Sequence, residues 1–216
     1  APSWLTARPI AHRGLHDRQA GRIENSPSAA RAAVEASFAI ECDVQLSADG
    51  EAMVFHDFRL DRLTAETGAV KDRSAAELAA MTLAASADRI PGLPDFLALI
   101  GGRVPLIVEI KSAFDGDLRL ARRTAEVVAG SDTPIALKSF DPDVIAFLRQ
   151  NRAPLGLAAT PAVVWFRREL TLPVEGAIPF LSFDDQCFYR QWALEVGPGG
   201  GAHLETVFEC SSAAGI

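Results

Sequence analysis

The sequence is poor in several residue types, and each shortage argues against a class of protein. It has only three cysteines, an odd number at scattered positions, which disfavours a disulfide framework and indicates a reducing compartment. Acidic residues outnumber basic ones by 28 to 21, and the net charge of −7 argues against a nucleic-acid partner. No apolar run approaches the ~20 residues of a membrane span, and no signal-peptide pattern opens the chain. We therefore predict a cytoplasmic protein without a membrane span.

What is present is a regular alternation of short apolar runs and longer Ala- and Leu-rich segments. The 216 residues are enough for one domain with a buried core, which we expect to cover 1–216. The apolar runs predict strands, and several lack polar alternation, as parallel strands covered on both faces do. They are Pro9 to His12, Phe38 to Val44, Ala52 to His56, Val104 to Lys111, Pro134 to Phe140, Pro154 to Ala159 and Ala177 to Phe183.

The segments between these runs carry clear helix signals. Ser26-Pro27 and Asp141-Pro142 each place a capping residue before a proline at the first helical position. Ser74 with Glu77 forms a capping-box pattern, and residues 115–130 are strongly amphipathic. Repeated strand–helix units favour an α/β fold, a (β/α)8 TIM barrel, with a doubly wound open sheet as the second choice. The segment 58–90 is too long for a simple connection, and we expect it to form a small insertion after the third strand, over the mouth of the site.

Residues that could do chemistry follow or end the predicted strands, which is where a barrel places its active site. Glu41 and Asp43 are two residues apart, so on a strand they share a face and could hold one cation. His12 and His56 end two other strands and would flank that cation. Such an arrangement suits metal-assisted phosphoester or glycosidic chemistry.

A second pair repeats this spacing. Glu109 and Lys111 follow the apolar run Leu106-Ile107-Val108 and share a face, and burying both would be costly without partners. A cation for Glu109 and an anionic substrate group for Lys111 would satisfy them. Three carboxylates with water suit Mg²⁺ or Ca²⁺ as the cofactor.

These fragments, in this order, resemble the glycerophosphodiester phosphodiesterase family. The resemblance rests on His12-Arg13-Gly14, Glu24-Asn25, Glu41-x-Asp43, His56-Asp57, Leu60 to Thr64, Glu109-Ile110-Lys111 and Ser139-Phe140, and runs from about Pro9 to about Pro154. It implies a TIM barrel and cleavage of glycerophosphodiesters to glycerol 3-phosphate and an alcohol. The expected partner is thus a small-molecule glycerophosphodiester, and nothing in the sequence indicates an oligomeric state.

The resemblance also implies roles for individual residues. Glu41, Asp43 and Glu109 would be metal ligands, and His12 and His56 an acid–base pair. Arg13 and Lys111 would hold the phosphate. For Asn25 we favour a loop-fastening role, and Asp57 either orients His56 or only ends its strand.

The resemblance ends after Phe183, where a glycine-rich stretch and a tail of small residues replace the last two strands of the family. The nearest strand candidate there is Thr206 to Cys210. We therefore expect C-terminal strands that are incomplete or irregular, with truncation and frameshift as alternatives. Two other functions are weighed against the leading one: phospholipase D-type cleavage of lysolipid head groups, and a non-catalytic barrel.

Overall fold

The computed structural model describes residues 3–5, 7–151, 177–182 and 203–209. The chain forms two compact units, Ala1–Trp165 and Phe166–Ile216. In the second unit β6 (Ala177–Ser182) pairs in parallel with β7 (His203–Glu209). The strand predicted at Ala177 is thus found, and the one predicted at Thr206 begins three residues earlier. The strand predicted over Pro154 to Ala159 lies outside the described residues.

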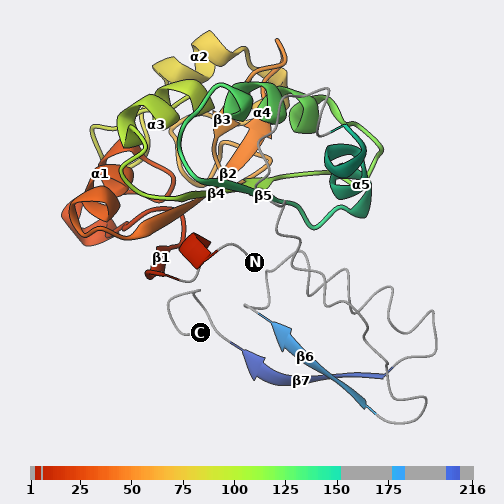
Figure 1. Ribbon diagram of the computed structural model, residues 1–216. Coiled ribbons are helices and arrows are strands. Elements are labelled where there is room, and N and C mark those ends of the chain that lie inside the picture. Colours follow the sequence, from red (N-terminus) through yellow and green to blue (C-terminus); the bar gives the residue numbers. More distant parts are fainter. Residues whose placement is uncertain (1–2, 6, 152–176, 183–202, 210–216) are drawn as a thin grey trace. The chain divides into compact units, whose positions relative to one another are not determined.

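The first unit is built on one sheet whose parallel strands run in the order β1-β2-β4-β5 (Figure 1). The register places Asp43 beside Glu109 and Glu109 beside Lys138, so three neighbouring strands present polar side chains at one level. The bounds of these strands are β1 Ile10–Ala11, β2 Ala39–Leu46, β4 Leu106–Ile110 and β5 Ile135–Lys138.

The third strand of the chain runs against the others. β3 (Ala52–Val54) is antiparallel to the far end of β2, with Val44 opposite Val54. Our expectation that every site residue lies at the carboxyl end of its strand is therefore wrong for Asp43, because β2 continues to Leu46 in order to pair with β3. This return strand brings the chain back towards Asp43, whose carbonyl accepts a hydrogen bond from Phe55 N at 3.0 Å. His56 follows at once.

The helices begin where the capping signals predict. Ser26 Oγ accepts a hydrogen bond from Ala29 N at 3.1 Å at the start of α1, and the capping box of Ser74 opens α2. The amphipathic helix begins at Arg119 rather than 115, because Gly116 takes a positive φ that interrupts helical backbone. Helix bounds are α1 Pro27–Glu35, α2 Ala75–Ala80, α3 Leu93–Ile100, α4 Arg119–Ala129 and α5 Pro142–Gln150, with short 3-10 turns η1 Ser3–Leu5, η2 Arg18–Ala20 and η3 Val70–Asp72.

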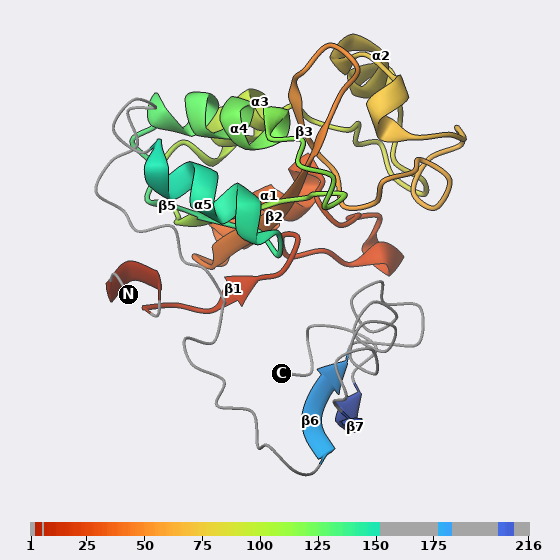
Figure 2. The same cartoon turned by 90° about the vertical axis from the view of Figure 1, so that its right-hand side faces the viewer.

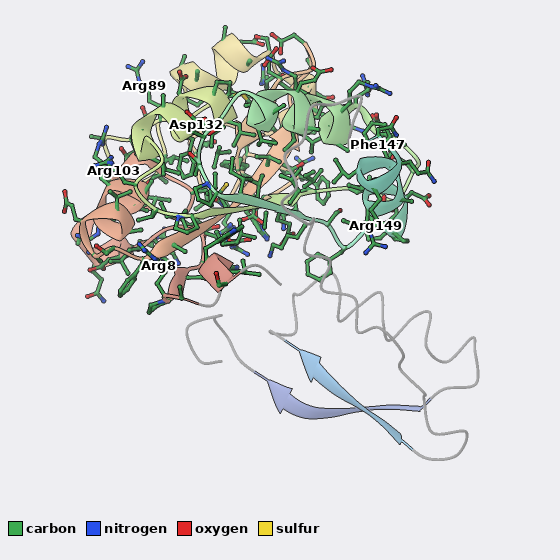
Figure 3. All side chains as sticks on the ribbon, viewed as in Figure 1. Arg8, Arg89, Arg103, Asp132, Phe147 and Arg149 are labelled. Carbon is green, nitrogen blue, oxygen red and sulfur yellow. The ribbon has the colours of Figure 1, made fainter. Side chains whose placement is uncertain are left out.

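The two faces of the sheet have different roles. One face, with Ile40, Cys42 and Val44 of β2, packs in a large apolar core against α1, α3, α4 and α5 (Figures 1 and 2). The exposed arginines Arg89 and Arg103 lie on the outside of this layer (Figure 3). The opposite face carries Ala39, Ile107 and Ala136, and Trp4 and Leu5 pack over them. Two residues further along the same three strands, this face carries polar side chains, namely Glu41, Glu109 and Lys138. Alternation along the strands therefore separates the core from the site.

The segment 58–90 forms an apolar cluster with residues in β3 and directly after it. Its buried members include Leu60, Val70 and Leu83, which pack with Met53 and Phe55. Within the described ranges the helices are too short or too polar to cross a bilayer.

Candidate active site

The three predicted carboxylates come together on the polar face of the sheet. Glu41 and Asp43 lie on β2 and Glu109 lies on β4, and one oxygen of each is within 4.8 Å of the others. All three side chains are buried, with at most 4% of each residue exposed. Two ligands of one cation at 2.3–2.6 Å can be at most about 5 Å apart, so the spacing fits a common ion.

Two lysines neutralise this cluster. Lys111 Nζ is 2.8 Å from Asp43 Oδ1 and also contacts Glu109. Lys138 Nζ is 2.7 Å from Glu109 Oε2 and 3.0 Å from Glu41 Oε1. Lys138 was not among the predicted site residues. It lies at the end of β5, directly before the Ser139-Phe140 pair that carried part of the resemblance, and only the sheet register brings it to the triad.

The carboxylates differ in their proton affinity. Burial raises the pKa of Glu41 to about 7, and the neighbouring Asp43 carboxylate adds to this shift. Burial also opposes ionisation of Asp43 and Glu109, but Lys111 and the other cationic neighbours outweigh it and lower both pKa values. The carboxylates in turn raise the pKa of Lys138 against the effect of its burial. Of the three carboxylates, Glu41 is thus the one whose negative charge is least stabilised by neighbouring cations.

A buried atom without a hydrogen bond supports the interpretation of the triad as a cation site. Among the described residues Glu41 Oε1 is buried without a hydrogen-bond donor, and Lys138 Nζ forms an ion pair with it at 3.0 Å. A buried acceptor left in this way is costly unless something else binds it. An oxygen-preferring cation such as Mg²⁺ or Ca²⁺ would do so, and the three carboxylates are the ligands it would take.

Arg13 and His12 lie beside the triad on the turn after β1. Arg13 has a positive φ of 58°, and its backbone N–H donates to Glu41 Oε2 at 3.1 Å. Its Nε is 3.3 Å from Asp43 Oδ2. His12 Nε2 is 3.9 Å from Glu41 Oε2, and burial together with the Arg13 charge lowers the pKa of His12 to about 4. His12 is therefore neutral at pH 7 and able to accept a proton.

His56 is held from two sides. Its carbonyl accepts a hydrogen bond from Gln45 Nε2 at 2.8 Å, and its Nδ1 is 2.7 Å from Asp57 Oδ1. Burial opposes ionisation of Asp57, but His56 and Arg62 outweigh it and keep the pKa of Asp57 well below its usual range, so Asp57 is a carboxylate that accepts a hydrogen bond from Nδ1–H of His56. Of the two roles considered for Asp57, contact with His56 is the one found.

Arg62 connects this arm to the other side of the site. Its guanidinium donates to Asp57 Oδ2 at 2.6 Å and to Glu24 Oε1 at 2.7 Å. Glu24 Oε1 also accepts a hydrogen bond from Arg13 Nη1 at 2.9 Å. Arg62 thus links Asp57, which contacts His56, to Glu24, which contacts Arg13. Its position in Leu60 to Thr64 was part of the resemblance, but its contacts span 38 residues of sequence and were not predicted.

Asn25 does more than fasten a loop. Its Nδ2 donates to Asp43 Oδ2 at 2.9 Å, and its Oδ1 accepts from Asp43 N at 3.2 Å. Asn25 also has a positive φ of 58°, and its N–H donates to the carbonyl of Arg13 at 2.9 Å. It therefore both holds the loop and orients a carboxylate of the triad.

Comparison with known proteins identifies the family of this chain. The model of the glycerophosphoryl diester phosphodiesterase family matches residues 12–167. A curated glycerophosphodiester phosphodiesterase of Caldanaerobacter subterraneus subsp. tengcongensis is 37% identical over 111 residues, which make up 48% of this chain and 44% of that protein. The chain thus spans less than half the length of this relative.

Two solved structures are similar in fold. An Oleispira antarctica phosphodiesterase in complex with the product sn-glycerol-3-phosphate has a TM-score of 0.62 at 19% identity, over 89% of this chain and 73% of its own. A glycerophosphodiester phosphodiesterase of Agrobacterium tumefaciens has a TM-score of 0.58 at 26% identity, over 68% and 64%. This likeness confirms the predicted α/β barrel class.

Proposed function

Because the chain belongs to the glycerophosphoryl diester phosphodiesterase family, we propose that it hydrolyses glycerophosphodiesters to glycerol 3-phosphate and an alcohol with the help of a divalent cation. The observation that carries the proposal is the convergence of Glu41, Asp43 and Glu109 beside His12 and Arg13. The Oleispira neighbour, which holds sn-glycerol-3-phosphate, supports a substrate of this size. The location in the cytoplasm and the single-domain organisation stay predictions.

The charges of the site suit a phosphodiester. A cation held by the triad would act as a Lewis acid on the phosphoryl oxygens, where negative charge develops in the transition state. Arg13 and Lys111 add fixed positive charge on the same face of the sheet. Together they attract the substrate anion and stabilise the additional charge.

The two histidines would move the protons. His12, neutral at pH 7, accepts the proton of the attacking oxygen, which in a cyclic-phosphate route is the glycerol 2-hydroxyl. His56, whose Nδ1–H is held by Asp57, would enter this step as the imidazolium, give its Nε2 proton to the leaving alkoxide and become the neutral imidazole, with the Asp57 carboxylate stabilising the imidazolium charge. The roles reverse when water opens the cyclic phosphate. Each transfer typically contributes ~10²–10⁴-fold in rate.

One observation favours a second candidate, the phospholipase D-type cleavage of lysolipid head groups. Phe58, Phe114 and Phe140 are 41–48% exposed, and each follows a site residue within three positions. The Phe140 ring centre is 5.9 Å from Lys138 Nζ. Apolar side chains around a phosphate site suit a substrate with an acyl chain. A non-catalytic barrel, in contrast, would not need charged groups buried at this density.

The test uses two substrates and one control variant. Glycerophosphocholine should yield glycerol 3-phosphate, and excess chelator should abolish the reaction until Mg²⁺ or Ca²⁺ is restored. Glu41→Gln, which loses a ligand charge at nearly constant volume, should be inactive with or without added cation. Faster choline release from lysophosphatidylcholine than from glycerophosphocholine would favour the second candidate. Absence of turnover on both substrates would leave the non-catalytic alternative.

A further inference from the structure

We propose that Lys138 is a built-in counter-cation of the triad, and that a divalent cation binds only by displacing its ammonium group. The proposal rests on the cation site of the proposed function and concerns how that site is regulated. It assigns to Lys138 a role in setting cation affinity.

Four of the six carboxylate oxygens of Glu41, Asp43 and Glu109 have partners other than Lys138. Both oxygens of Asp43 have partners, Oδ1 in Lys111 and Oδ2 in Asn25 and Arg13. Glu41 Oε2 accepts the N–H of Arg13, and Glu109 Oε1 contacts Lys111. The other two oxygens, Glu41 Oε1 and Glu109 Oε2, are both contacted by Lys138.

Withdrawal of this one side chain would therefore free one oxygen on each of two ligand residues. Lys138 forms ion pairs with these two oxygens at 3.0 Å and 2.7 Å, and a cation bound in its place would take over both contacts. No other residue in the described part of the chain bridges Glu41 and Glu109 in this way. Displacement of Lys138 is thus the shortest route to an open cation site.

Lys138 is also the lysine that is able to leave. Its side chain is 20% exposed, whereas that of Lys111 is 6% exposed and lies between Asp43 and Glu109. The face of the Phe140 ring lies 5.9 Å from Lys138 Nζ and offers the ammonium a second favourable contact. A displaced Lys138 would remain at the edge of the site, where its charge can meet the phosphate of a substrate.

The net charge of the carboxylate cluster also indicates that Lys138 opposes cation binding. Three carboxylates are balanced by Lys111, Lys138 and Arg13, so the cluster is neutral without a metal when all six groups are ionised. A divalent cation that binds the three carboxylates is repelled by the Lys138 ammonium group at close range. In a medium of intermediate dielectric this repulsion lowers the affinity for the cation. Removing the Lys138 charge should therefore tighten cation binding.

The test is calorimetric titration of Mg²⁺ and of Ca²⁺ into the chelator-stripped full chain, without substrate. Lys138→Gln should lower the Kd at least about tenfold, and the cation should raise its melting temperature more than that of the wild type. Lys138→Arg keeps the charge and should bind like the wild type. Lys71→Gln removes an exposed lysine and serves as the matched control.

The outcomes separate this proposal from the proposed function. If the wild type binds the cation and Lys138→Gln binds it no more tightly, the counter-cation role is wrong and the cation site stands. If neither protein binds a cation, both proposals fail. If Lys138→Gln folds only with cation present, the counter-cation role is supported, whereas failure to fold at saturating cation would overturn it.

Discussion

Gly14→Ala should strongly destabilise the protein, because the turn that positions His12 and Arg13 has no room for a side chain. A Cβ at Gly14 would lie 2.9 Å from Ala29 Cβ and 3.0 Å from the Ala29 backbone carbon, in a completely buried part of α1. Gly14 also has a φ of +79°, which L-residues adopt at a cost of ~1–2 kcal/mol. Neither obstacle can be relieved by rotating a flexible side chain.

A second glycine separates the two contributions. Gly116 has the same φ of +79°, but a Cβ there would meet nothing within 4 Å. Gly116→Ala should therefore cost only the backbone term, ~1–2 kcal/mol. Gly14→Ala adds overpacking, which typically costs ~1–3 kcal/mol, so its total should be ~2–5 kcal/mol.

Urea unfolding of the wild type and both variants, extrapolated linearly to water, measures the difference. Turnover of glycerophosphocholine by the folded fraction should fall for Gly14→Ala, since a shifted Ala29 would carry the turn away from Glu41, and should be unchanged for Gly116→Ala. Equal destabilisation by the two substitutions would show that the contact with Ala29 does not constrain the turn.

Three more predictions concern the histidines and Arg62. His12→Ala and His56→Ala should each lower kcat at least ~10²-fold while calorimetry shows unchanged cation binding; near-wild-type turnover by either variant would refute the two-histidine route. Arg62→Gln should lower kcat, and in combination with Asp57→Asn the loss should be smaller than the two single losses combined, since part of the effect of Arg62 passes through Asp57; fully additive losses in activation free energy would contradict this connection. In the chelator-treated protein, the lowered pKa of His12 means that between about pH 6.5 and pH 4 the unfolded chain binds a proton that the folded chain does not. The free energy of unfolding therefore keeps the full contribution of neutral His12 above about pH 6.5 and loses it as the pH falls towards about 4. His12→Gln should reduce the fall in the free energy of unfolding between pH 7 and pH 5, measured by urea unfolding. An identical fall in the wild type and the variant would count against a lowered His12 pKa.

The local elements of this fold are predictable because their signals lie within a few residues. Ser26 caps α1 and Asp141 caps α5 through contacts two or three positions away, and Ser74 pairs with Glu77 in the same way. Boundaries are less predictable where a backbone angle decides them, as at Gly116 before α4. The antiparallel orientation of β3 could not be predicted locally, because a short apolar run has the same pattern in a parallel and in an antiparallel strand.

In the site, the two-residue spacing of Glu41 and Asp43 was enough to predict that these carboxylates could share a cation, because a strand places residues two apart on one face. It could not determine that Lys138 joins them. That contact depends on the register of β4 against β5, and strand register is set by packing of the whole sheet against the helices. The link from Arg62 to Glu24 likewise required the segment 58–90 to fold onto the turn after β1. Spacing along one strand was thus enough to predict two candidate ligands, whereas the charge balance around them depends on how the strands and the segment 58–90 pack together.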